Sequence, residues 1–247
     1  MQRFYTPGLY GKLPAHGDFV VRDLPSSFVN DWDLWLQQFM NGTRERIGND
    51  WLNIYLTSPL WRFVLSPGVI DSNVWAGIVM PSVDRVGRYF PFSIALKLPG
   101  DVNPLDFLTA KSNWFAEMEE LTISALHGQV TLDDLSQRLA QCKLTLNSSY
   151  RRAMPMKGIK DLYSEMEFEE QLPASIYPQF LDYCLSEMFS SYSVWATDGS
   201  ERVSPCLFTT QHLPTMEKMS AMLDGQWRQW DCHQPYELKK NNDLDQK

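Results

Sequence analysis

Two short segments of the chain are dense in side chains that can bind ions or move protons, and each segment lies beside apolar runs. One spans residues 8–22 and the other spans residues 81–91. The candidate site residues, in chain order, are Lys12, His16, Asp18, Arg22, Ser82, Asp84, Arg85 and Arg88. Serine, histidine and aspartate are the residue types of a hydrolytic triad, whereas lysine and arginine bind carboxylates and phosphates.

The hydrolytic interpretation uses Ser82, Asp84 and His16, which would converge if both segments lay at one end of the same sheet. The sequence has no GxSxG elbow, P-loop, HExxH or GxGxxG pattern, and no pair of oxyanion donors is evident. The four histidines are not spaced as metal ligands. We therefore expect no catalytic residues, no metal and no cofactor, and keep a small hydrolase or ligand-binding enzyme as the alternative.

A structural interpretation of the same residues is that ion pairs lock the second segment. Arg85 or Arg88 would pair with Asp84 or Asp18 and hold a hairpin against the N-terminal turn. Gly87 would supply a backbone position with positive φ. The segment would then be a rigid hairpin end between two strands.

A binding interpretation is compatible with that one, because a locked loop is also preorganised. Four cations would then present a positive surface to an acidic or phosphorylated segment of a partner, namely Lys12, Arg22, Arg85 and Arg88. Such a field on an otherwise acidic protein can steer an anionic partner.

Hydrophobic patterning predicts the elements that position these segments. Strands are expected at residues 8–13, 18–21, 61–65, 74–80, 89–98, 191–195 and 203–208. Helices are expected from an N-cap at Ser26 to about Arg46, from Asn103 to Gly128, from a capping box at Thr131, through Leu181 to Met188, and after Pro214. Short connections favour antiparallel pairing. The predicted fold class is α+β, a mostly antiparallel central sheet covered by helices on both faces, with a longin-like β-β-α-β-β-β-α core plus C-terminal helices and strands.

Several longer blocks carry a resemblance to a known family. They read GLYGKLPAHGDFVVRDLP from Gly8, WDLWL from Trp32, SPLWRF from Ser58 and MPSVDRVGRYFP from Met80. Together with blocks in the C-terminal third, they resemble the TagF family of bacterial type VI secretion accessory proteins. The resemblance covers most of the chain, although residues 144–172 match nothing.

The resemblance implies a non-enzymatic, post-translational regulator. Proteins of this family repress assembly of the secretion system together with a forkhead-associated scaffold protein. Some relatives are fused to a phosphatase, a domain that we do not expect in this chain. Such a scaffold protein is therefore the expected partner.

Composition and charge set independent limits. The 247 residues carry a formal net charge of −8, which argues against a nucleic-acid partner. No apolar run approaches the roughly 18 residues of a membrane span, and no secretory leader is evident. We therefore expect no integral membrane segment and a cytoplasmic location, where four scattered cysteines stay reduced.

The expected domain organisation has three parts. Residues 1–128 form the longin-like core, residues 129–236 pack on the same unit, and residues 237–247 are a polar tail. Within the second part, residues 151–170 carry basic and then acidic side chains, which is typical of a solvated connection.

Overall fold

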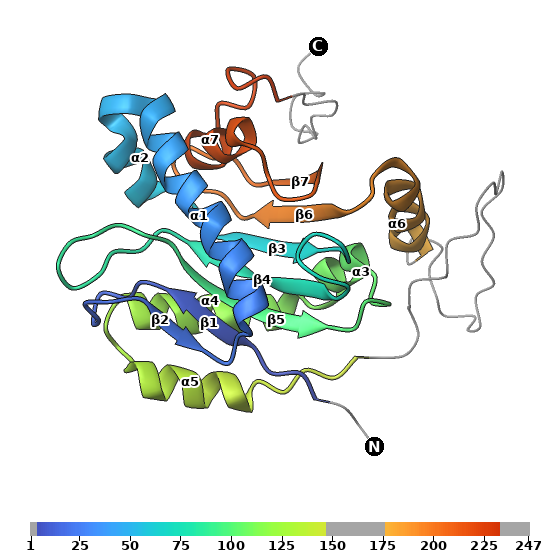
Figure 1. The fold of residues 1–247 in the computed structure, drawn as a ribbon, viewed down its shortest axis with the longest axis horizontal. Helices are drawn as coiled ribbons and strands as arrows, with labels where there is room; N and C mark the ends of the chain where they lie inside the picture. Colours follow the sequence, from blue (N-terminus) through green and yellow to red (C-terminus); the bar gives the residue numbers. More distant parts are fainter. Residues whose placement is uncertain (1–3, 147–175, 233–247) are drawn as a thin grey trace, which may run out of the picture.

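A single seven-stranded antiparallel sheet forms the centre of the computed structural model, which describes residues 4–146 and 176–232 (Figure 1). The order across the sheet is β2 (Val20–Arg22), β1 (Gly8–Gly11), β5 (Phe92–Leu98), β4 (Val74–Met80), β3 (Trp61–Leu65), β6 (Tyr192–Thr197) and β7 (Cys206–Gln211). The α+β prediction is confirmed, and the C-terminal strands extend the sheet formed by the N-terminal ones. The predicted connection at residues 151–170 and the tail at 237–247 lie outside the described residues.

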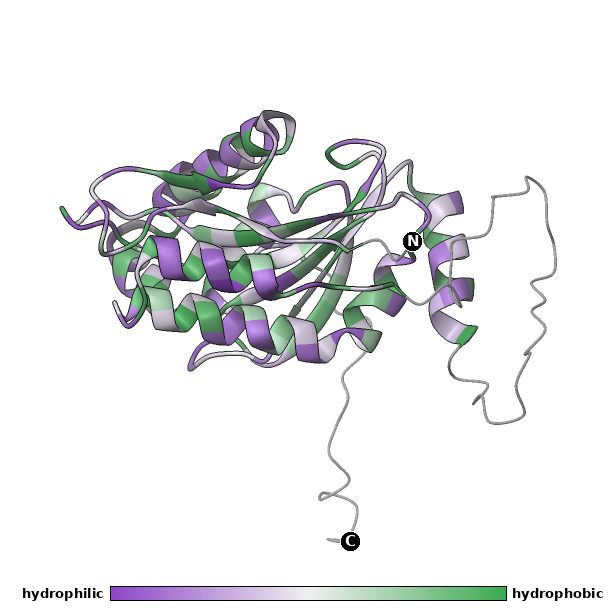
Figure 2. Ribbon diagram, turned by 90° about the horizontal axis from the view of Figure 1, so that it is seen from below, coloured by the Kyte–Doolittle hydropathy of each residue, from purple (hydrophilic) through white to green (hydrophobic). Residues whose placement is uncertain are grey.

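Helices cover both faces of the sheet, as predicted. One face carries α1 (Ser26–Ile47), α2 (Trp51–Thr57) and α7 (Met216–Asp224), which contact one another. The other carries α3 (Pro104–Ala110), α4 (Ser112–Leu126), α5 (Leu132–Gln141) and α6 (Tyr177–Met188). Figure 2 shows hydrophobic and hydrophilic bands alternating along these helices, as expected for elements with one buried side.

The central strands contribute to two hydrophobic cores. On β4, Val74, Ala76 and Ile78 join the core under α3, α4 and α5, whereas Trp75 and Val79 join the core under α1 and α7. A strand buried on both faces needs an almost continuous apolar run, because successive side chains point to opposite sides. This burial explains why the sequence before the second polar segment shows no alternation.

The aromatic residues of α1 form a stripe along one side of the helix, and this stripe packs into the second core. Trp32 is fully buried and lies between Phe28 and Trp35, with ring centroids 5.5 and 4.9 Å away. Its indole Nε1 donates a hydrogen bond of 3.0 Å to Oγ of Ser93 on β5. The stripe therefore fixes α1 across the sheet above the strands that carry the polar segments.

Two helix predictions need correction. Ser26 is the first helical residue instead of the N-cap, because Pro25 precedes the helix in extended conformation and no side chain caps the end. The helix expected from Asn103 to Gly128 is two helices, because Lys111 leaves helical geometry at φ −110° and ψ 31°. The break lets Phe107 of α3 pack edge-on against Trp114 of α4, with centroids 5.7 Å apart.

Some strand ends also differ from the prediction, and one helix was missed. β5 begins at Phe92 and not at residue 89, since Pro91 has no N–H to donate to a strand partner. The strands expected at 8–13, 18–21, 191–195 and 203–208 are Gly8–Gly11, Val20–Arg22, Tyr192–Thr197 and Cys206–Gln211. Helix α2 was not predicted, because its seven residues are too few to display helical periodicity.

Candidate functional site

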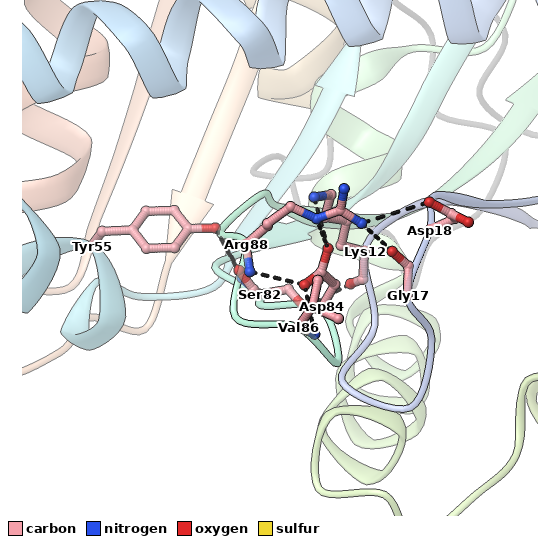
Figure 3. Close-up of polar contacts among 8 residues, drawn as sticks. All are labelled: Lys12, Gly17, Asp18, Tyr55, Ser82, Asp84, Val86 and Arg88. Carbon is pink, nitrogen blue, oxygen red and sulfur yellow. Dashed lines mark hydrogen bonds and ion pairs between the residues drawn. The ribbon is translucent and has the colours of Figure 1, made fainter.

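The two polar segments lie side by side at one end of the sheet (Figure 3). The hairpin tip (residues 81–91) connects β4 to β5, and the N-terminal turn (residues 12–19) connects β1 to β2. β1 pairs with β5 so that Gly11 faces Phe92. A Cβ at Gly11 would lie 2.2 Å from the carbonyl oxygen of Pro91, and its φ is 133°. Glycine is therefore required where the two backbones converge.

A buried carboxylate is the centre of the hairpin tip. Oδ1 of Asp84 accepts hydrogen bonds from the backbone N–H groups of Val86 (3.0 Å) and Arg88 (2.8 Å). Oδ2 accepts from Nζ of Lys12 at 2.9 Å and from Nε of Arg88 at 2.7 Å. The Asp84 side chain has no exposed surface. Four donors therefore satisfy a carboxylate that would otherwise be costly to bury.

These donors control the protonation of Asp84. Burial acts to raise the pKa of its carboxyl, because the charged form loses water. The hydrogen bonds from the Arg88 backbone, the Lys12 ammonium, the Arg88 guanidinium and the Val86 backbone outweigh burial and hold this pKa well below its usual range. Asp84 is thus a fixed anion, and not a proton donor or acceptor near neutral pH.

Further contacts join the hairpin tip to the N-terminal turn. The Arg88 guanidinium donates to the carbonyl of Gly17 and lies 3.6 Å from the carboxylate of Asp18, which is 98% exposed. The backbone N–H of Arg85 donates to the carbonyl of His16 at 2.9 Å. Gly87 has φ 86°. The expected ion pairs of Arg88 and the positive φ are present.

Tyr55 and Ser82 form a third attachment, to helix α2. The Tyr55 hydroxyl donates to the carbonyl of Ser82 at 3.1 Å and accepts from its N–H at 3.0 Å. Burial raises the pKa of Tyr55, although the hydrogen bond with Ser82 acts against it. Tyr55 was not a candidate residue, because only the fold brings α2 to the hairpin.

Lys12 does not have the surface role that the sequence suggested. Only 6% of the residue is exposed, and its ammonium lies between the Asp84 carboxylate and the ring of Phe19, 5.0 Å from the ring centroid. The expectation that Lys12 contributes to an open cationic surface is therefore wrong. A lysine can be buried here because a carboxylate and an aromatic face replace its water.

Arg85 and Arg22 are exposed. Arg22 donates to the carbonyl of Val21 at 2.8 Å. Within the described ranges, neither guanidinium has an ion pair, and the Arg85 side chain has no hydrogen bond. Both can therefore meet an external anion.

Ser82, His16 and Asp84 do not form a hydrogen-bonded set. The Ser82 hydroxyl is buried and donates to the carbonyl of Lys12 at 2.6 Å. The carboxylate of Asp84 bonds to Lys12, Val86 and Arg88, as described above. Each polar group of the supposed triad except the His16 ring is thus engaged in holding the backbone.

Within residues 4–146 and 176–232, no three or more histidine, cysteine, aspartate or glutamate side chains are grouped as metal ligands. No helix in those ranges has the length and apolar character to cross a membrane.

Comparisons with known proteins agree with the fold and the sequence blocks. Residues 8–142 match the model of the family described as TagF N-terminal domain, Type VI secretion system-associated. No curated protein matches the chain. A crystal structure of PA0076 from Pseudomonas aeruginosa PAO1 is similar, with a TM-score of 0.74 and 33% sequence identity over 95% of this chain and 99% of that one. The chain belongs to the TagF N-terminal domain family and is a type VI secretion system-associated protein.

Proposed function

We propose that this protein is a non-enzymatic cytoplasmic regulator that represses assembly of a type VI secretion system by binding a forkhead-associated scaffold protein. The observation that carries the proposal is the locked hairpin tip, on which the exposed side chain of Arg85 lies near Gly17 and has no hydrogen bond or ion pair within the described residues. A binding surface benefits from such rigidity, because little conformational entropy is lost when the partner binds.

The charge of the tip supports an acidic partner surface. Lys12 and Arg88 contribute two positive charges, which the buried Asp84 and the exposed Asp18 balance. Arg85 adds a positive charge without an ion pair in the described ranges beside this cluster, on a chain whose formal net charge is −8. A local positive field on an acidic protein accelerates and orients the approach of an anionic partner.

No specific observation favours the hydrolase alternative. A serine nucleophile needs a free hydroxyl next to a base. Only 5% of Ser82 is exposed, and its hydroxyl is bonded to a backbone carbonyl. A non-enzymatic role, in contrast, does not require the Ser82 hydroxyl to be reactive.

The experiment compares Arg85→Glu with wild type in binding to the purified scaffold protein and in a secretion assay. The variant should bind at least about tenfold more weakly, because charge reversal at an interface adds repulsion to the lost attraction. Secretion should then be released from repression. The melting temperature should stay within about 2 °C of wild type, since the exposed Arg85 side chain has no hydrogen bond or ion pair in the described part of the chain.

The matched control is Arg138→Glu, which makes the same charge change on an exposed position of α5. Equal losses of binding in both variants would indicate a general charge effect. Wild-type binding by a folded Arg85→Glu protein would exclude the hairpin tip as the docking surface.

A further inference from the structure

A groove lies next to the hairpin tip, on the side facing α1. Its volume is about 360 Å³, and its walls come from three elements that are separate in the sequence. Polar and aromatic lining residues include Gln37, Asn41 and Arg44 of α1, Trp51 of α2, and Arg88 and Tyr89 of the hairpin tip. No carboxylate lines this groove among the described residues, although the chain as a whole is acidic.

Arg44 is held in the groove without being neutralised. Its guanidinium lies 5.8 Å from the ring centroid of Trp51, which places the cation over an aromatic face. Trp51 is itself fixed, because its Nε1 donates to Oγ1 of Thr43 at 2.9 Å and its ring stacks on Tyr55 at 5.0 Å. Over residues 4–146 and 176–232, Arg44 has no ion pair or hydrogen bond from its side chain.

Arg46, the neighbouring arginine of α1, differs from Arg44 because it has an ion-pair partner. Arg46 is paired with Glu217 of α7, with its NH2 nitrogen and the carboxylate oxygen 2.9 Å apart. Arg44 instead shares its groove with the guanidinium of Arg88, which pairs with the buried Asp84 and the exposed Asp18. The groove therefore contains the positive charge and the hydrogen-bond donors of Arg44, which the described chain does not satisfy.

We infer that this groove binds an oxyanion carried by a side chain of an acidic protein segment, with Arg44 as the principal cation and Arg88 as the second. The inference rests on the proposed function in assigning that segment to the regulated partner. The ligand is a carboxylate or a phosphate monoester, since arginine donors match both. Trp51 keeps the Arg44 guanidinium in place, so that less side-chain entropy is lost on binding.

A titration with small probes tests the groove without any partner. N-acetyl-phosphoserine amide, N-acetyl-glutamate amide and the neutral N-acetyl-serine amide are added at constant ionic strength to the full chain. The Nε–Hε signal of Arg44 is followed by NMR and assigned with Arg44→Gln. We expect saturable shifts with the charged probes and none with the neutral one. Phosphoserine binding more tightly than glutamate would indicate a phosphorylated segment, and equal binding an acidic one.

Two variants on the same helix make the test specific. Arg44→Gln should weaken binding of the charged probes by about three- to tenfold, the effect of losing one charge-assisted hydrogen-bond partner. Arg46→Gln should bind them like wild type, because Arg46 pairs with Glu217 instead of lining the groove. Unchanged probe affinity in Arg44→Gln, or an equal loss in Arg46→Gln, would overturn the inference.

The same variants are then measured against the purified scaffold protein. Weaker partner binding by Arg44→Gln, with Arg46→Gln unchanged, supports the assignment of the oxyanion to the partner. A scaffold protein that binds wild type and Arg44→Gln equally overturns that assignment. If wild type does not bind the scaffold protein, the proposed function fails, while the probe titration still decides whether the groove is an oxyanion site.

Discussion

Two ionic clusters in this fold differ in how deeply their carboxylates are buried. In the hairpin tip, two cations share the carboxylate of Asp84, whose side chain is fully buried. On β3, Arg62 bonds to both carboxylate oxygens of Glu119 on α4 and also pairs with Asp198 beyond β6. With the exposed Asp18, which also pairs with Arg88, the first cluster is neutral, whereas the second has one excess negative charge.

The clusters differ even more in their access to water. Arg62 and Glu119 retain 22% and 20% of their side-chain exposure, and Asp198 retains 78%. Each can recover hydration if its partner is removed, whereas Asp84 cannot. A buried carboxylate therefore imposes a precise backbone arrangement, while a part-exposed pair only adds to the attachment of elements that already pack together.

The largest loss of stability is expected from Asp84→Asn. The change leaves the buried ammonium of Lys12 without its counter-ion. It also replaces one acceptor oxygen by an NH2 donor, which must face either Lys12 and Arg88 or the two backbone N–H groups. Breaking a buried pair in this way is strongly destabilising, and for a chain of this size the melting temperature should fall by roughly 10 °C. Thermal unfolding followed by circular dichroism measures this. A fall of under about 3 °C would show that the cluster does not determine the conformation of the tip.

The pH dependence of that loss sharpens the comparison. Because the folded protein holds the pKa of Asp84 well below its usual range, the carboxylate stabilises the fold fully above the unfolded pKa of about 3.9. This contribution is lost as the pH falls through the folded pKa. The stability difference between wild type and Asp84→Asn should therefore be constant above about pH 5 and narrow below about pH 4. Denaturant titrations of both proteins from pH 7 to pH 3 measure this stability difference. A difference that stays constant over the whole range would contradict a lowered pKa of Asp84 in the folded protein.

A smaller effect is expected at the other cluster from Arg62→Met. The methionine keeps most of the packing volume, and Glu119 is left with access to solvent. The free energy of unfolding should fall by about 1 kcal/mol, equivalent to about 3 °C in melting temperature. A loss as large as that of Asp84→Asn would show that solvent access does not distinguish the two clusters.

Much of the fold could be predicted from local patterns. Val74–Met80 and Phe92–Leu98 are apolar runs of strand length between turn residues, and they form the centre of the sheet. The capping box of Thr131 and Asp134 begins α5 as expected. These predictions succeed because the determining interactions lie within a few residues of one another.

The geometry of the site could be predicted only in part. The residue types of the hairpin tip and the pairing of Arg88 with Asp84 follow from sequence spacing. The burial of Lys12 does not, because it depends on the close approach of Gly11 to Pro91, two segments far apart in the chain. The groove containing Arg44 and Trp51 was missed for the same reason, since α1, α2 and the hairpin meet only in the folded protein.

The smallest effect is expected from Asp18→Asn, which gives the closest comparison with Asp84→Asn. Both aspartates pair with the guanidinium of Arg88, and both substitutions remove one carboxylate charge. Asp18 is 98% exposed and 3.6 Å from its partner, so that water and salt screen the pair. The melting temperature of the Asp18→Asn variant should lie within about 2 °C of wild type in the same unfolding experiment. A loss approaching that of Asp84→Asn would mean that charge balance around Arg88, and not burial of the Asp84 carboxylate, holds the hairpin tip in place.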